Sequence, residues 1–289
     1  ETLIEEYNWA VAAEFADSIG VDIINSSLGY TTFDIASQDH SYADMDGKTT
    51  VISRAATMAS RKGMIVCNSA GNSGNNSGYY IGAPADADSI LSVGSVNADG
   101  ISSSFSSYGP SSDGRVKPTV SAQGGNTTVI TSSNAIANSN GTSFSSPIIA
   151  GMTACLWQAH YQKSNMQIIE AITQSAHLYL TPNNQMGFGI PNYSLANALL
   201  QDIEAIDEVT LDVYPNPVSS NARAYLYTAN HTDISYRLVD VRGRKIMQGK
   251  NDWSYALISI KIPALPSGIY FLEATIGNKV LVERLNVVN

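Results

Sequence analysis

One short segment has a residue type and a setting suited to nucleophilic chemistry. Residues 140–148 read NGTSFSSPI and lead into an apolar stretch. A serine hydroxyl attacks a carbonyl effectively only when a base takes its proton and hydrogen-bond donors hold the resulting oxyanion. We expect Gly141 to allow a turn that presents Ser143, and Pro147 to lie in the first turn of a helix whose amino end supplies free amides. The alternative is that Ser143 is an ordinary helix cap.

The base that Ser143 needs is not evident in this sequence. Four histidines are present, and none has the surroundings of a catalytic base or an aspartate placed to orient it. They lie in a polar loop, at the end of the predicted nucleophile helix, after a later helix and in the C-terminal part: His40, His160, His177 and His231. A metal site is conceivable around His40 with Asp39, Asp44 and Asp46, but a solvated loop is the favoured interpretation.

The composition is that of a globular chain with an acidic balance. Of 289 residues, 44% are hydrophobic and 14% are charged, and the formal net charge is −9. The length suits two domains of ordinary size, and the negative charge argues against nucleic acid and anionic membranes as partners. No apolar run is long enough to span a bilayer. Because the chain starts at Glu1 with neither a methionine nor a signal-like segment, we expect a processed or cleaved end.

Two cysteines, Cys67 and Cys155, each lie in an apolar stretch. Free buried thiols are the favoured interpretation, because buried cysteine behaves as a small hydrophobic residue. A disulfide between the two is the alternative.

The first 200 residues alternate between helical and strand-like patterns. Helical spacing occurs at 4–19, 49–61, 141–161, 167–175 and the end of 187–200, and short apolar strands at 21–25, 64–67 and 90–96. The apolar residues that fall near one face of the first helix are Ile4, Tyr7, Ala10, Val11, Phe15 and Ile19. Apolar strands alternating with helices predict an α/β fold, with a mostly parallel sheet covered by helices on both faces.

Near residue 207 the pattern changes to short alternating segments bounded by turn residues. These segments are 222–227, 235–241, 257–262, 269–276 and 280–288. We therefore expect two domains: an α/β domain over 1–206 and a small all-β module, most simply a sandwich, over 207–289.

The segment around Ser143 resembles the nucleophile motif of the subtilisin family, Gly-Thr-Ser-x-x-Ser-Pro followed by an Ala-Gly helix. Four further stretches resemble the same family in order and spacing: Ser27-Leu28-Gly29, Ser69-Ala70-Gly71-Asn72, residues 105–118 and residues 187–192. The resemblance covers about residues 1–200. It departs from the family pattern at Gln123 and Thr119, both of which are backbone-shaping positions.

The resemblance implies roles for particular residues. Ser27, Leu28 and Gly29 would pair with the substrate backbone, and Ser69, Ala70 and Gly71 would form a wall of the primary specificity pocket. Asn72 would hold the oxyanion, although asparagine is also ordinary in a turn of this composition. Gly82 resembles the floor of the primary pocket, and a simple turn glycine is an equal alternative.

The family resemblance also implies an activity and a partner. The activity is hydrolysis of peptide bonds in proteins or peptides by a secreted serine endopeptidase, through an acyl-enzyme on Ser143. In this family the catalytic Asp and His precede the substrate-binding edge, so an N-terminal part of the same protease would supply them. No cofactor is evident in this chain, and calcium could bind in the absent portion. The alternative is a non-catalytic secreted protein that retains a protease-like peptide-binding groove.

The C-terminal module resembles the sorting domain used for type IX secretion in Bacteroidetes. The similar stretches are residues 214–217, 240–244 and 265–270, and the resemblance covers about 210–289. It implies an interaction with the secretion machinery and a location outside the cell or at its surface. A generic β module that packs on, or tethers, the protease is the alternative.

Overall fold

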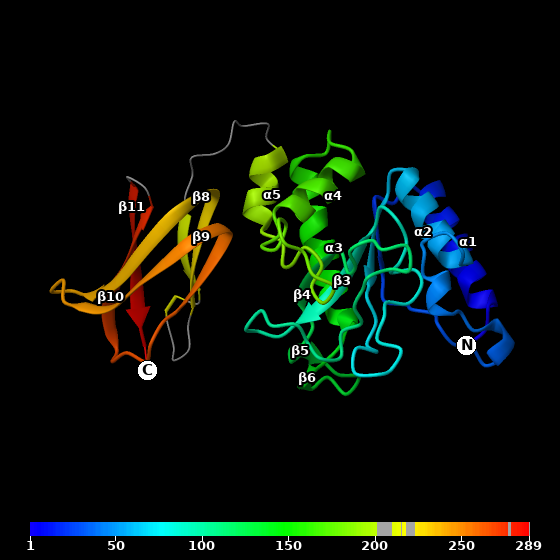
Figure 1. The fold of residues 1–289 in the computed structure, drawn as a ribbon, viewed down its shortest axis with the longest axis horizontal. Coiled ribbons are helices and arrows are strands. Elements are labelled where there is room, and N and C mark those ends of the chain that lie inside the picture. Colours follow the sequence, from blue (N-terminus) through cyan, green and yellow to red (C-terminus); the bar gives the residue numbers. More distant parts are fainter. Residues whose placement is uncertain (201–209, 215, 218–222, 277–278, 289) are drawn as a thin grey trace. The chain divides into compact units, whose positions relative to one another are not determined.

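The chain forms two compact units in a computed structural model, which describes residues 1–200, 210–214, 216–217, 223–276 and 279–288 (Figure 1). The units are Glu1–Leu200 and Gln201–Asn289. The boundary predicted near residue 207 lies outside the described residues.

A four-stranded parallel sheet, in the order β1-β2-β3-β4, forms the centre of the first unit. Its strands are β1 (Ile23–Ser26), β2 (Ile65–Ser69), β3 (Leu91–Val96) and β4 (Val120–Gln123). Every residue of β2 and β3 is buried, as expected for parallel strands that are covered on both faces. β1 lies at one edge of the sheet, and most of its residues are partly or fully exposed.

Helices cover both faces of this sheet, which confirms the predicted α/β class (Figure 1). α1 (Ile4–Ser18) and α2 (Val51–Arg61) pack on one face. α3 (Thr142–Ala159), α4 (Asn165–Gln174) and α5 (Tyr193–Leu200) pack on the other. Local caps set the starts of two helices, because the side chains of Thr50 and Ser164 accept hydrogen bonds from backbone amides of α2 and α4.

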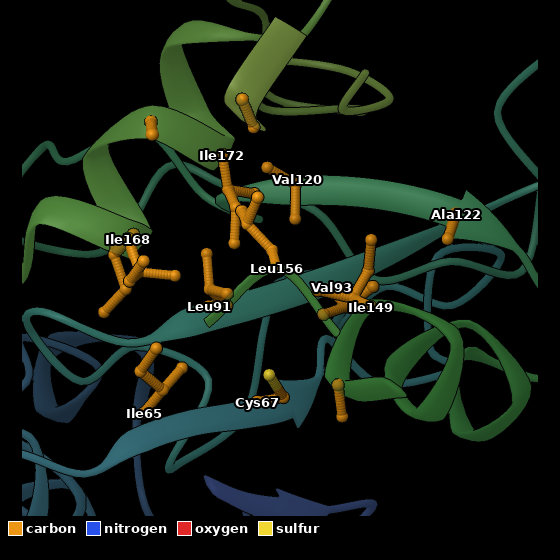
Figure 2. Close-up of a cluster of buried hydrophobic side chains, with 14 of the residues drawn as sticks. Ile65, Cys67, Leu91, Val93, Val120, Ala122, Ile149, Leu156, Ile168 and Ile172 are labelled. Carbon is orange, nitrogen blue, oxygen red and sulfur yellow. The ribbon is translucent and has the colours of Figure 1, made fainter. Parts of the chain in front are cut away.

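Figure 2 shows the core between the sheet and the second helix layer, where aliphatic side chains from strands and helices meet. Leu91 and Val93 of β3 lie opposite Ile149 and Leu156 of α3, and all four are at most 5% exposed. This apolar contact holds α3 on the sheet, because burying each such side chain stabilises the fold by about 1.5–3 kcal/mol.

The helix predicted over residues 4–19 is present, but its apolar face points outward. Glu6, Trp9 and Ala13 are its buried residues. Five large apolar side chains at helical spacing are between 54% and 64% exposed, and we call them the α1 stripe: Ile4, Tyr7, Val11, Phe15 and Ile19. A surface helix normally turns such a stripe toward a core, so the α1 stripe marks a face on which another element could pack.

Three local features differ from the sequence-based expectations. A hairpin of β5 (Thr127–Ile130) and β6 (Ile136–Ser139) precedes α3, and the sequence pattern does not predict it. Short 3₁₀ turns, η1 (Ala36–Gln38) and η2 (Tyr42–Asp44), interrupt the polar loop expected around His40. Both cysteines are free thiols, but only Cys67 is buried, and Cys155 is exposed.

The second unit is all-β, as predicted, and its described strands are antiparallel. Its strands are β7 (Thr210–Tyr214), β8 (Arg223–Asp240), β9 (Lys245–Lys261), β10 (Gly268–Ile276) and β11 (Lys279–Val287). The order is β11-β10-β8-β7, with β9 paired to β8. Two of the predicted strands merge into the long β8, whose pairing with β9 shifts register between Thr228 and Thr232. Leu238, Leu272 and Leu285 lie in a separate hydrophobic core.

Candidate active site

Ser143 is the second residue of α3 and is half-buried. Within the described part of the chain its amide N–H has no backbone acceptor, as expected in the first turn of a helix. The positive end of the helix macrodipole therefore lies at the serine. Pro147 lies further inside α3 than its first turn, which corrects the prediction. Because proline has no N–H, it gives the carbonyl of Ser143 no intrahelical bond.

Asn72 is held against the start of α3 by two hydrogen bonds to Thr142. Its Oδ1 accepts from the backbone N of Thr142 at 2.9 Å and from the Thr142 Oγ1 at 3.0 Å. The backbone N–H of Thr142 can donate only to an acceptor, so the side-chain amide of Asn72 must turn its oxygen, and not its NH₂ group, toward Thr142. Asn72 is exposed, and its Nδ2 has no acceptor among the described residues. The Asn72 amide group and the free N–H of Ser143 thus flank the same residue, Thr142.

Thr142 is the residue that joins these parts, and the sequence patterns do not single it out. Its side chain is fully buried, and its Oγ1 also accepts from the backbone N of Gly71 at 3.2 Å. Gly71 has a φ of 106°, and a Cβ there would lie 2.9 Å from Ser107 Oγ. Glycine is needed at this position, because side chains disfavour that φ and the added carbon would be crowded.

Gly141 does not form the special glycine turn that the sequence predicts before Ser143. Gly141 has an extended backbone, with a φ of 164°, which any residue could adopt. The crowded position is Gly124, whose N–H donates to the carbonyl of Val96 and whose carbonyl accepts from the N of Gly141 at 2.9 Å. A Cβ at Gly124 would overlap Ser145 Oγ and the carbonyl oxygen of Gly141. Close approach of the two backbones therefore places the residue before Thr142.

The predicted substrate edge and pocket wall lie next to each other at the carboxyl ends of β1 and β2. Asn68 Nδ2 donates to the carbonyls of Leu28 at 3.0 Å and Ser69 at 2.8 Å. Ser27, Leu28 and Gly29 are exposed, as a segment that receives a peptide must be. Ser69 and Ala70 are buried, and Gly71 is half-buried.

Gly82 joins the same edge through a backbone pairing. Tyr30 N donates to the Ala83 carbonyl at 2.8 Å, and Ala83 N donates to the Tyr30 carbonyl at 3.2 Å. A Cβ at Gly82 would lie 3.2 Å from Thr31 Cγ2, so this glycine packs closely against residues 30–31. The pairing places Gly82 directly beside the end of the 27–29 segment.

Three histidines have other partners. His160 Nε2 lies 2.8 Å from Asn197 Oδ1. His177 Nδ1 accepts from the backbone N of Ile190 at 2.9 Å, and burial lowers the pKa of this imidazole. His40 contacts the buried Glu6, and its ring packs edge-on against Phe33, so it is not the solvated loop residue expected. His231 lies in β8.

Metal binding and membrane insertion find no support in the described residues. No group of three or more His, Cys, Asp or Glu side chains there could hold a metal ion. Among these residues His40 contacts Glu6. No helix in the described part of the chain is long and apolar enough to cross a bilayer.

Sequence comparison agrees with this geometry. The model of the subtilase family matches residues 1–189, and that of the secretion system C-terminal sorting domain matches residues 212–288. The first match covers well over half of the chain, so the chain belongs to the subtilase family of proteases. The sorting domain implies secretion or a cell-surface location, and an interaction with the secretion machinery.

Curated relatives include subtilisin NAT of Bacillus subtilis subsp. natto, which is 31% identical over 193 residues. That alignment covers 66% of this chain and 45% of the relative. A thermophilic serine proteinase of Bacillus sp. (strain AK1) is 32% identical over 167 residues, covering 58% of this chain and 35% of the relative. The chain thus spans about half the length, or less, of these two proteins.

Solved structures share the fold. The self-cleaved protease domain of PatA aligns with a TM-score of 0.54 at 22% identity and covers 68% of each chain. MycP1 from Mycobacterium smegmatis aligns with a TM-score of 0.53 at 24% identity, covering 66% of this chain and 54% of that one.

Proposed function

We propose that this chain carries the nucleophile, oxyanion hole and substrate groove of a secreted serine endopeptidase. Ser143 Oγ attacks the carbonyl carbon of the scissile peptide bond and gives its proton to a histidine base. The same histidine then protonates the leaving amine, which leaves an acyl-enzyme on Ser143 that water hydrolyses. The histidine, and the aspartate that orients it, come from an N-terminal part of the same protease.

The anchored amide of Asn72 is the observation that carries this proposal. Two hydrogen bonds from Thr142 fix its oxygen, so its Nδ2 is pre-oriented. Together with the free N–H of Ser143 at the positive end of α3, it provides two donors for developing negative charge. Donors held in place before the reaction stabilise a transition state most, because they need no reorganisation.

The exposed surfaces of the first unit support an N-terminal partner. β1 pairs with β2 alone among the described strands, so its other edge presents unsatisfied backbone groups. A groove of about 600 Å³ runs between this edge and α3, with Ile23, Cys155 and Trp157 in its lining. α1, which leads into β1, carries the α1 stripe on its outer side. An additional parallel strand on β1, with a layer over α1, would cover all three features.

Reconstitution with the N-terminal part of the protease tests this proposal. Peptide hydrolysis should appear only when both parts are mixed, and Phe15→Asp in the α1 stripe should weaken their association by ten-fold or more. Ile101→Asp is the matched control, because Ile101 is 63% exposed and Phe15 is 64% exposed. Peptide binding without hydrolysis in the complete complex would instead support a non-catalytic peptide-binding protein.

A further inference from the structure

A buried lysine lies beneath the loop that carries Gly82. Lys117 is 4% exposed, and its Nζ donates to the backbone carbonyl of Ala87 at 2.7 Å. Lysine is almost never fully buried unless its ammonium has partners. Burial lowers the pKa of Lys117 to about 7, with the positive charge of Arg115 acting in the same direction. The aliphatic part of the Lys117 side chain and its Nζ thus take the place of water beneath the Ala87 carbonyl.

The buried carboxylate of Asp86 holds the same loop next to Ala87. Asp86 is fully buried, and its carboxylate accepts from Ser53 Oγ at 2.5 Å and from the backbone N of Gly47 at 2.7 Å. Arg115 adds a bond from Nη2 to the carbonyl of Asp46 at 2.9 Å. Hydrogen bonds from three separate chain segments, donated by Lys117, Ser53 and Gly47, therefore hold residues 86–87.

The loop between Gly82 and Ala87 is short and internally bonded. Ala85 N donates to the carbonyl of Gly82 at 2.8 Å, and Ala87 N donates to the carbonyl of Pro84 at 2.9 Å. At its first end Ala83 pairs with Tyr30 beside the substrate edge, and at its last end Ala87 rests on Lys117. Because these two turns link Ala87 to Gly82 through consecutive hydrogen bonds, we expect a shift of Ala87 to move Gly82 as well.

We propose that Lys117 is a positioning residue that sets the depth of the primary specificity pocket by holding the 82–87 loop at Ala87. This inference rests on the proposed function only in its assignment of Gly82 to the pocket floor. Removing the ammonium leaves the Ala87 carbonyl buried without a donor, and the loop then moves to satisfy it. A displaced floor changes which side chain fits before the scissile bond.

The primary test measures amide hydrogen exchange in this chain carrying Lys117→Met, reconstituted with the N-terminal part of the protease. The amides of Ala85 and Ala87 should exchange about five-fold faster, because one hydrogen bond is worth about 1 kcal/mol and its loss frees the loop. Amides of β3 should keep their rates, which separates loop release from global destabilisation. Lys62→Met is the matched control, because Lys62 is 59% exposed and its Nζ lies 3.5 Å from Asp17.

The second measurement uses the reconstituted protease. Two peptide substrates are compared, one with a large apolar residue and one with alanine before the scissile bond. Lys117→Met should lower the ratio of their kcat/KM values, large residue over alanine, by about ten-fold, mainly through KM. If the wild type hydrolyses nothing, the proposed function fails, and amide exchange still decides whether Lys117 holds the loop. If Lys117→Met does not fold, Ser53→Ala replaces it, and should speed exchange at residues 85–87 several-fold. Unchanged exchange in the folded variant, or an unchanged preference ratio in an active enzyme, would overturn the inference.

Discussion

Replacing Thr142 with valine should weaken the proposed oxyanion hole without removing either of its donors. The side chain is fully buried, so the isosteric valine fills the same space. The substitution removes the Oγ1 donor that lies 3.0 Å from Asn72 Oδ1, and the acceptor that lies 3.2 Å from Gly71 N. The backbone bond from Thr142 N to Asn72 remains, so the asparagine is loosened rather than released.

The magnitude follows from the two lost bonds. A neutral hydrogen bond contributes about 0.5–1.5 kcal/mol, so losing the bonds to the Asn72 amide and the Gly71 turn costs about 1–3 kcal/mol in total. That corresponds to a fall in kcat of about 5-fold to 150-fold. Complete loss of the oxyanion asparagine in the related subtilisin costs about 10²–10³, so Asn72→Ala should be more severe than Thr142→Val. Because an oxyanion exists only after attack, KM should not change.

The assay is steady-state hydrolysis of one peptide by the reconstituted protease, with Thr142→Ser as the matched control. Serine keeps the hydroxyl and loses a methyl group, so it should stay within about three-fold of wild type if the hydrogen bonds matter most. Wild-type kcat in Thr142→Val would refute the role of this anchor. So would equal losses in the serine and valine variants, since packing would then explain both.

Three further predictions concern stability. Residues 1–206 expressed alone should not unfold cooperatively, because the α1 stripe and the open edge of β1 are left uncovered. The β module from about residue 210 should fold alone. Circular dichroism melts of the two pieces test both expectations, and a cooperative transition for residues 1–206 would contradict the first. Gly124→Ala should lower the free energy of unfolding of the reconstituted protease by about 1–3 kcal/mol, because the new methyl group overlaps Ser145 and the Gly141 carbonyl; a denaturant melt equal to that of wild type would contradict this. The pKa of Lys117 is about 7 in the folded chain against an ordinary 10.5, so the unfolded chain binds the extra proton and stability should rise with pH above 7, by at most about 1.4 kcal/mol per unit. The charge of Lys117 also interacts with four neighbours: Asp86, Asp88, Asp113 and Arg115. The measurement is therefore the slope of the free energy of unfolding against pH, compared between wild type and Lys117→Met from pH 7 to pH 9. Equal slopes would show that Lys117 does not titrate in that range.

The parts of the fold that follow from local sequence were accessible without a structure. The buried strands β2 and β3, the helix after Ser143 and the all-β module each have a short-range pattern, and the structure contains all of them. The ordered motifs also place Asn72 and Ser143 in one site, which Thr142 joins by hydrogen bonds across 70 residues of sequence.

What the sequence does not reveal depends on contacts between distant segments. Thr142 looks like any residue of its motif until its hydroxyl meets Asn72 and Gly71. Periodicity shows that α1 is amphipathic, but not that its apolar side faces away from this chain. The crowding at Gly124 arises from the backbone of Gly141, which no local pattern reveals. The burial of Lys117 likewise depends on a loop 30 residues earlier in the chain.

The most direct test of the central claim is the rate at which a fluorophosphonate labels Ser143. The probe mimics an acyl donor, so labelling needs a base that takes the Ser143 proton as well as the oxyanion donors. The isolated 289-residue chain should label hardly at all, and the rate should rise by about 10³ or more when the N-terminal part is added. Ser143→Ala should abolish labelling in both samples. Rapid labelling of Ser143 in the isolated chain would contradict the account, because the base would then lie within these 289 residues.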